Sequence, residues 1–473
     1  MANALLRYTM NTIREKKSIF AWSLLPSVIS LAWPTMLEHL MQTAVQYIDT
    51  AMVGSMGTQA TAAVGSTVSV NWLINSTVIA LGVGFLAVIS QSIGAGNLER
   101  ARKASAQAVL AVLVSGCLFT VLALGLSGLI PRWIQLEPEL RPLASHYFFI
   151  IFLPMLPRSA SMIFGTVLRA AGDTRTPMRI GLQVNLINVT LNFLLIFEPR
   201  TVSLFGHAVR IWGAGWGVTG AATASAIAFL YGGIAITRAL YRHDNISPKG
   251  LSIRPDMSVL KPCLKIAFPN MMQRFATSLG YVAFASMINA IGETATAAHT
   301  IANTVESAFY IPGYGMQAAA ATLTGNAIGA GDRERGRALA RLIFLCEISL
   351  MLLSGGLLLA FAPAMVRMFS PDPAVILLGS IVLRMVACSE PFFGLVIVIE
   401  GMLQGAGQTR RPFVFNVIGM WGVRITGTFI CTRWLNMGLI AAWGCMIGHN
   451  MLLFLLFAIY FHSGHWNPLE REA

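Results

Sequence analysis

Charged residues are scarce in this sequence of 473 residues, because Asp, Glu, Lys and Arg together make up 11% of it. A typical soluble domain carries about 25%. Hydrophobic residues make up 55% of the chain. So few charges cannot coat a soluble protein of this length, and the composition therefore indicates a membrane protein.

Several motifs of enzymes and of secreted disulfide proteins are also missing. The six cysteines form no CxxC pair, so the sequence predicts neither a disulfide framework nor a zinc site. The turns IGAGN and IGAGD follow apolar stretches rather than strands, and they have no GxxxxGK pattern. We therefore expect no enzyme activity and no cofactor, and any transport is expected to draw on an ion gradient rather than on ATP.

Long apolar stretches recur along the chain, most of them long enough for the ~20 residues that a helix needs to cross a bilayer. They predict an all-α integral membrane protein with twelve transmembrane helices. The twelve stretches cover residues 22–53, 61–92, 104–130, 142–169, 176–197, 213–240, 259–290, 295–327, 338–362, 374–405, 411–432 and 437–461.

The surplus of basic residues, a formal net charge of +13, is unevenly distributed between the loops. Most Lys and Arg fall on the side that holds the N-terminus, and the loops on the other side hold six. By the positive-inside rule this asymmetry predicts both termini in the cytoplasm of a multi-pass protein of the inner membrane. The charge indicates contact with anionic lipids and not with nucleic acid.

Similar segments recur at an offset of 235 residues. IGAGNLERARK at 93–103 matches IGAGDRERGRA at 328–338, GDTRTP matches GQTRRP, and Pro34 matches Pro269. A longer loop after Phe197 shifts the later matches by 14 residues. Six spans in each half give a parallel repeat, typical of two-lobed transporters. We expect a cytoplasmic tail at 1–21, a first lobe at 22–240, a cytoplasmic linker at 241–258, a second lobe at 259–462 and a cytoplasmic tail at 463–473.

An aspartate, Asp49, interrupts the first apolar stretch 15 residues after Pro34. An ionisable residue within a membrane span is costly unless it is paired or hydrated, and it marks a functional site by default. Burial favours the neutral carboxyl, so Asp49 is expected to take up a proton, whereas a bound Na⁺ favours the ionised form. Pro34 removes a helix hydrogen bond and is the expected hinge. The alternative is an interfacial aspartate that caps a backbone group.

The fifth stretch carries three amides, Asn185, Asn188 and Asn192, at spacings that place them on one helical face. They either hold helices together or line a polar cavity with Asp49. The repeat places Phe284 at the position of Asp49 in the second half. The carboxylate therefore belongs to the first lobe alone.

Taken together, these segments resemble the multidrug and toxic compound extrusion (MATE) family of bacterial transporters. The resemblance covers nearly the whole chain. It is carried by VQYIDTAMVG, SQSIGAGNLERARK, GTVLRAAGDTRTP, LINVTLNF, AAHTIANTVESAFYIPGYGMQAAAATLTGNAIGAGDRERGRA and EGMLQGAGQTRRP.

This resemblance implies two six-helix lobes around a V-shaped central cleft. It also implies export of cationic or amphipathic organic compounds by exchange for H⁺ or Na⁺. Asp49 falls on the family's coupling-ion position, Asn188 and Asn192 on its polar pair, and Ser225 near a hydroxyl position. Gln42 falls on a position that lines the cavity.

One departure concerns the second lobe. Some Na⁺-coupled members carry acids at positions that are Thr277 and Phe393 here. Coupling is therefore expected to centre on Asp49, with a proton favoured over Na⁺ and with Asp49 as the ligand if Na⁺ is the ion. Glu306 and Glu390 are the alternative candidates for the coupling residue in the second lobe. The substrate cavity is expected to include Gln42, Gln273, Thr277, Glu306 and Glu390.

An alternative function stays open at this stage, a flippase for lipid-linked oligosaccharides or polysaccharides from the same superfamily. Such a protein needs cationic groups that face the cleft and hold pyrophosphate. Four arginines are available to hold pyrophosphate, namely Arg158, Arg274, Arg384 and Arg424. If these arginines pair with Glu306 and Glu390 instead, the flippase function is disfavoured. In either case a monomer in contact with membrane lipids is expected.

Overall fold

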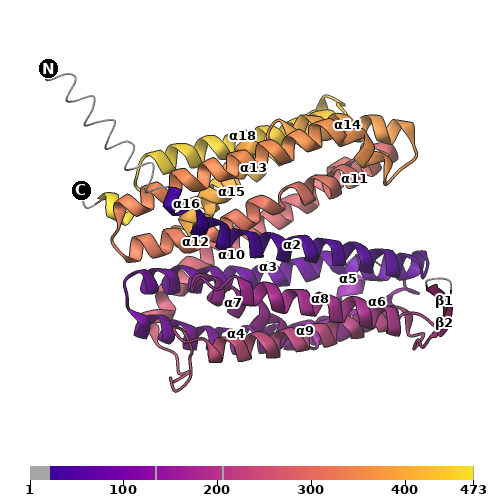
Figure 1. Cartoon of the computed structure of the whole chain (residues 1–473). Coiled ribbons are helices and arrows are strands. Elements are labelled where there is room, and N and C mark those ends of the chain that lie inside the picture. The colour runs from indigo at the N-terminus through magenta and orange to yellow at the C-terminus, as the bar shows by residue number, and fades with distance from the viewer. Residues whose placement is uncertain (1–21, 134–135, 205–206, 472–473) are drawn as a thin grey trace. The chain divides into compact units, whose positions relative to one another are not determined.

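The computed structural model describes residues 22–133, 136–204 and 207–471 (Figure 1). The predicted cytoplasmic tail at 1–21 lies outside these residues. Within them the chain is helical apart from its connections and one short hairpin.

Each of the twelve predicted stretches coincides with one helix or with a pair of consecutive helices, except the eleventh, which coincides with four consecutive helical segments. The first half holds α2 (Leu25–Gly54), α3 (Thr58–Gly94), α4 (Leu98–Leu126), α5 (Ile130–Trp133), α6 (Arg141–Phe152), α7 (Met155–Ala170), α8 (Arg175–Leu195) and α9 (Gly217–Arg242). The second half holds α10 (Met257–Asn289), α11 (Glu293–Phe309), α12 (Ile311–Gly329), α13 (Arg333–Arg367), α14 (Pro373–Ala387), α15 (Glu390–Gly405), α16 (Arg410–Val417), η1 (Ile418–Ile425), α17 (Thr426–Phe429), η2 (Ile430–Trp434), α18 (Leu439–His462) and α19 (Pro468–Arg471).

Length and apolarity alone identify fewer spans than the repeat does. Among the described residues, six helices are individually long and apolar enough to cross a membrane, and up to eight if each bent pair counts as one span. The bent pairs are α6 with α7, at 51°, and α14 with α15, at 55°. Together with α2, α8, α10 and the pair α11–α12, these helices match the twelve predicted stretches. The prediction of an all-α membrane fold with twelve spans is confirmed.

The internal repeat is visible in the backbone. Three pairs of glycines at the 235-residue offset all have positive φ, where a side chain would be strained. Gly57 and Gly292 have φ of 106° and 141°, Gly96 and Gly331 of 70° and 69°, and Gly172 and Gly407 of 86° and 75°. Each pair ends corresponding helices in the two halves. The matching turns explain why the IGAGN and IGAGD segments carry glycine at these positions.

The extra length after Phe197 is accounted for by a β-hairpin, which the sequence did not predict. Strand β1 (Arg200–Leu204) pairs antiparallel with β2 (His207–Ile211), and Val202 lies opposite Val209. The hairpin lies between α8 and α9, where the second half has no described counterpart. It lengthens this loop and leaves the helical frame unchanged.

The chain forms two compact units. Unit 1 contains Met1–Met36, Leu86–Leu98 and Pro262–Ala473, and unit 2 contains Leu37–Phe85 and Glu99–Lys261. The boundary crosses α2 between Met36 and Leu37, two residues after Pro34. The helix continues through this point, because α2 is helical from Leu25 to Gly54 with Pro34 inside it.

Unit 2 is organised around α9, which packs against α6, α7 and α8. Small residues on α9 permit this contact. At Gly233, for example, an added Cβ would meet the backbone of Pro157 on α7. The ends of α2, α8 and α9 pack together through a buried apolar cluster. Its members are Val53, Ala60, Ile196, Val218 and Ala221, with Tyr147 of α6 packed against them.

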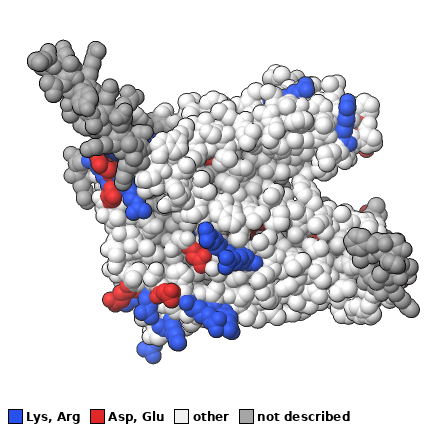
Figure 2. All heavy atoms as spheres, viewed as in Figure 1, with Lys and Arg blue, Asp and Glu red and all other residues white. Residues whose placement is uncertain are grey.

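The surface agrees with a membrane environment. Figure 2 shows charged side chains in a few separate groups, one of them near the middle of the face in view, with uncharged surface over most of the helices between them. Large apolar side chains point outward from mid-helix, for example Val114 on α4 and Leu353 on α13, which are 58% and 64% exposed. In water such exposure would be costly at about 25 cal/mol per Å² of apolar surface. In a bilayer these side chains contact lipid.

Candidate functional site

The candidate coupling-ion site begins with a contact between α2 and α8. The side chain of Asn192 donates a hydrogen bond from Nδ2 to Oδ1 of Asp49 over 2.6 Å. The two residues are 143 positions apart in the chain. A donor at this distance stabilises charge on the carboxylate, as charge-assisted hydrogen bonds do.

The network continues along α8 to α9. Asn192 Nδ2 also donates to Oδ1 of Asn188 over 3.2 Å, and Asn188 Nδ2 donates to Oγ of Ser225 over 3.0 Å. All four predicted coupling-ion residues therefore lie in one chain of hydrogen bonds within unit 2. Asn185, on the same face of α8, makes no hydrogen bond in this network.

The amide of Asn188 has two meaningful orientations. In the first, its oxygen lies 3.0 and 3.2 Å from the two carboxylate oxygens of Asp49, a contact between acceptors. In the second, the amide is rotated so that its nitrogen donates to both carboxylate oxygens, and its oxygen accepts from Ser225 Oγ. The second orientation gives the contacts of Asn188 with Asp49 and with Ser225 a donor and an acceptor each, although it also sets the Asn188 nitrogen 3.2 Å from Nδ2 of Asn192.

The site is buried on the α8 side. Asn192 is 1% exposed and Asn188 is 7% exposed, whereas Asp49 is half-buried. The apolar cluster around Val53 begins one helical turn beyond Asp49 and covers that end of the network. The Oδ1 atom of Asn192 is buried and has no hydrogen-bond partner among the described residues. A free oxygen beside a carboxylate is a suitable ligand for a hard cation such as Na⁺.

A second ionisable group lies near this network. Tyr147 on α6 is close enough to interact electrostatically with both Asp49 and Arg158. Arg158 is 5% exposed, and its guanidinium lies 4.3 Å from the ring centre of Phe229 and 5.7 Å from that of Phe152. A cation between two aromatic faces is stabilised by their quadrupoles. No carboxylate forms an ion pair with it in the described part of the chain.

The predicted substrate-cavity residues are spread over both units. Gln42 lies exposed on α2 within unit 2, whereas Gln273, Thr277, Glu306 and Glu390 belong to unit 1. In unit 1, Gln273 donates to Glu400 over 2.9 Å, and the hydroxyl of Tyr310 donates to Glu306. Glu390 is fully buried, and neither of its oxygens has a hydrogen-bond partner in the described part of the chain. No hydrogen bond that the structure describes joins the five predicted residues to one another.

Three buried acids have surroundings that were not predicted. Arg169 binds both carboxylate oxygens of Glu38, at 3.0 and 2.9 Å, and Glu400 accepts from Gln273 and Gln404. Glu347 on α13 is fully buried, with both oxygens unpartnered among the described residues. Each acid was visible in the sequence as a charge within an apolar stretch, but Arg169 and Gln273 lie on other spans than the acids they bind and leave no spacing signal.

The four arginines of the flippase alternative fall in both units, Arg158 in unit 2 and Arg274, Arg384 and Arg424 in unit 1. Among the described residues no ion pair joins them to Glu306 or Glu390. Arg424 lies over the rings of Phe284 and Tyr281, at 4.1 and 4.9 Å. Arg274 donates from Nε to Asn270, and Arg384 is exposed on α14.

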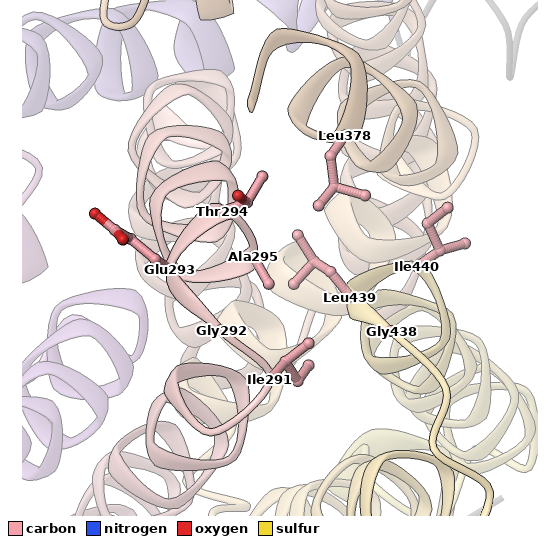
Figure 3. A pocket seen from close by; sticks show the side chains of 9 residues that line it. All are labelled: Ile291, Gly292, Glu293, Thr294, Ala295, Leu378, Gly438, Leu439 and Ile440. Carbon is pink, nitrogen blue, oxygen red and sulfur yellow. The ribbon is translucent and has the colours of Figure 1, made fainter. Parts of the chain in front are cut away.

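A pocket of about 380 Å³ lies in unit 1, apart from every predicted site residue. It is lined by the turn between α10 and α11, by Leu378 of α14 and by the start of α18. Figure 3 shows Leu378, Leu439 and Ile440 on one side of it, whereas the carboxylate of Glu293 points away from them. The lining is mostly apolar, and nothing in it resembles an ion site.

Comparisons with known proteins identify the family. The model of the MatE family matches the chain twice, over residues 34–194 and 269–430, so that the two matches begin at the repeated prolines. "Probable multidrug resistance protein NorM" of Thermotoga maritima is 28% identical over 448 residues, which cover 94% of each chain. "Probable multidrug resistance protein YpnP" of Bacillus subtilis is 27% identical over 458 residues, which cover 95% of this chain and 97% of the relative.

Solved structures show the same fold. The crystal structure of a MATE protein in complex with MaL6 superposes with a TM-score of 0.85 at 20% identity, covering 94% of this chain and 97% of the other. The predicted resemblance to MATE proteins is confirmed. The chain belongs to the MatE family, and it is a multi-pass membrane transporter rather than an enzyme.

Proposed function

We propose that this protein is a secondary active multidrug exporter that exchanges cationic or amphipathic organic compounds for H⁺. One observation carries the proposal. Asp49, the single carboxylate of the first-lobe network, is joined through Asn192 and Asn188 to Ser225, so three helices respond to its charge. The names of the relatives, multidrug resistance proteins, support the substrate class.

The choice of a proton follows from the hydrogen bonds of Asn188. A protonated Asp49 donates its hydrogen to Asn188 Oδ1, while Nδ2 of Asn192 donates to Asp49 Oδ1 and to Asn188 Oδ1, and Nδ2 of Asn188 donates to Ser225 Oγ. On proton release the Asn188 amide rotates and donates to the carboxylate, and Ser225 changes from acceptor to donor. Proton binding on α2 is thereby transmitted to α9.

Sodium coupling is the alternative within this proposal. The oxygens of Asp49, of Asn188 in its first orientation and of Asn192 are those that Na⁺ would use. The network holds one carboxylate, and a proton needs a single acceptor, whereas Na⁺ needs several oxygen ligands.

Alternating access is proposed to proceed by rocking of the two lobes around a V-shaped cleft. Pro34 is the proposed hinge, because it interrupts the hydrogen bonds of α2 and because the unit boundary falls two residues after it. A monomer in the inner membrane, with cytoplasmic termini and lipid contacts, completes the proposal. No observation favours the flippase alternative. Arg158 and Arg424 lie against aromatic rings, and Arg274 donates a hydrogen bond to the amide of Asn270.

Transport by purified protein in liposomes tests the proposal. An imposed pH gradient is expected to drive accumulation of a fluorescent organic cation without Na⁺, and addition of Na⁺ is expected to change the rate less than twofold. Transport that requires Na⁺ and ignores the pH gradient would identify the Na⁺ alternative. Absence of gradient-driven transport of every organic cation tested would contradict the proposed exporter.

A further inference from the structure

Two cysteines near one end of the last two spans lie side by side. The sulfur of Cys431 in η2 is 3.9 Å from the sulfur of Cys445 in α18. This is close to van der Waals contact, and both side chains are half-buried. All six cysteines are free thiols in this structure.

Local structure holds the two sulfurs together. The connection between the helices is four residues long, 435–438, and it turns tightly, with Asn436 at a φ of 49°. The backbone N–H of Met437 donates to the carbonyl of Cys431 over 2.8 Å, which folds the loop back on the end of η2. The facing cysteines are therefore brought together by a rigid hairpin.

A glycine leaves room for one of the sulfurs. Gly427 lies one turn before Cys431, and a Cβ added there would lie 3.0 Å from Cys445 Sγ. The thiol of Cys445 thus occupies space that the side chain of any residue other than glycine at position 427 would fill. A disulfide has a bond of about 2.05 Å, so the sulfurs need to approach by about 2 Å. Rotation of the two side chains about their Cα–Cβ bonds supplies a movement of this size.

The pair lies on the side of the membrane where disulfides persist. Cys431 is three residues from the end of η2, and Cys445 is six residues after the start of α18. At 1.5 Å per residue, both are within about 10 Å of the connecting loop. The charge distribution places this loop outside the cytoplasm, and the bacterial periplasm oxidises thiols.

We propose that Cys431 and Cys445 form an oxidisable pair that closes to a disulfide by exchange with a periplasmic thiol oxidoreductase. One cysteine thiolate attacks the disulfide of the oxidant and forms a mixed disulfide. The second thiolate then displaces the oxidant, which leaves with both of its sulfurs as thiols, and the two cysteines lose their protons to water. The product ties η2 to α18 and closes a hairpin whose arms carry Arg424 and His449.

Differential alkylation in intact cells tests this inference independently of transport. Cells that produce the full chain are acid-quenched, alkylated with light N-ethylmaleimide, reduced, and alkylated with the heavy reagent before mass spectrometry. Most copies are expected to carry the heavy label at both Cys431 and Cys445. Cys117, on α4, is the internal control and is expected to stay light.

Single substitutions separate pairing from other thiol modifications. In the Cys431→Ser variant, Cys445 is expected to become light, and Cys445→Ser is expected to do the same for Cys431. Light label at both positions in the unsubstituted protein would overturn the inference. Heavy label that persists at one cysteine after removal of the other would also overturn it, because the modification would then not be a bond between the two.

Discussion

Asn192 on α8 donates a 2.6 Å hydrogen bond to Asp49 on α2. Its own Oδ1 remains buried without a partner among the described residues. Asn192 therefore stabilises the ionised carboxylate of Asp49, and its free oxygen is available as a ligand for a cation that replaces the proton. This relationship makes the amide as important to ion exchange as the carboxylate.

Replacement of Asn192 is predicted to shift the pH dependence of export. Asn192→Leu removes a hydrogen bond to a charged group, worth about 1.5–3 kcal/mol. Because the ionised form of Asp49 loses this stabilisation, the proton is held more tightly, and the pH profile of efflux moves upward by about one to two units. The profile is measured in liposomes of fixed internal pH.

The matched control for this variant is on the same face of α8. Asn185→Leu makes the same chemical change at a residue outside the network, and it is expected to leave the pH profile in place. Equal shifts in both variants would show that polarity of the helix face, rather than the bond to Asp49, determines the profile.

Loss of the ion pair between Glu38 and Arg169 is predicted to destabilise unit 2. The pair is largely buried, with the side chains 10% and 19% exposed and an N–O distance of 2.9 Å. Removal of one partner from such a pair costs about 3–5 kcal/mol, because the remaining buried charge loses the carboxylate that it binds. Glu38→Gln is therefore expected to lower the thermal unfolding temperature of the protein, measured in detergent, by an amount that corresponds to this loss.

A double substitution distinguishes pairing from packing at this position. Glu38→Leu combined with Arg169→Met removes both charges and keeps apolar volume, and much of the lost stability is expected to return. If the double variant is as unstable as Glu38→Gln alone, the loss does not arise from an unpaired charge.

The repeated glycine turns are predicted to be sensitive to substitution. Gly331 has a φ of 69°, and a side chain in this conformation costs about 1–2 kcal/mol. Gly331→Ala is expected to lower stability by that amount, and Gly331→Asn by less, because Asn tolerates this region. Gly336→Ala, within α13, is the control and is expected to be neutral or stabilising, since its Cβ would meet Ala327 at 3.7 Å. An equal loss for both alanine variants would contradict the role of the turn.

The linker between the halves is predicted to loosen at low pH. Gln107 on α4 donates to the carbonyl of Arg254 and accepts from the N–H of Asp256, at 2.9 and 3.1 Å. Hydrogen bonds from the side chain and backbone of Ser258 hold the pKa of Asp256 below its usual value of 3.8. A lowered pKa means that the ionised carboxylate stabilises the fold, and this contribution disappears as the pH falls through the lowered value.

Hydrogen exchange at Ser258 measures this effect. The protection factor of its amide is expected to be constant between pH 7 and 5 and to fall below about pH 4. In Asp256→Asn, which keeps an acceptor without a charge, protection is expected to be independent of pH. A fall in protection with the same midpoint in both proteins would assign the titration to another group.

Much of this fold is readable from the sequence, because apolar length and repeated glycines are local properties. The apolar stretches predict each helix within a few residues, and the 235-residue offset predicts the paired turns at Gly96 and Gly331. Side-chain pairings between spans cannot be predicted in this way. Nothing in the spacing of Glu38 identifies Arg169, 131 residues later, as its partner. Asn188 and Asn192 were found because their own spacing marks a polar helix face.

Local backbone departures were also beyond prediction. The eleventh span is wound partly as π-helix, in η1 and η2, although its composition is that of an ordinary apolar helix. The breaks between α6 and α7 and between α14 and α15 fall beside Pro154 and Ser389, residues that elsewhere are tolerated within or near helices. Tertiary packing determines such features, and a single sequence carries little signal for them.

The central claim is that Asp49 holds the coupling ion. It is tested most directly by gradient-driven efflux of a fluorescent organic cation from vesicles that carry Asp49→Asn. We predict loss of transport by at least about tenfold, which corresponds to 1.4 kcal/mol or more, while binding of the same cation in detergent changes little. Transport by Asp49→Asn at the rate of the unsubstituted protein would contradict the account.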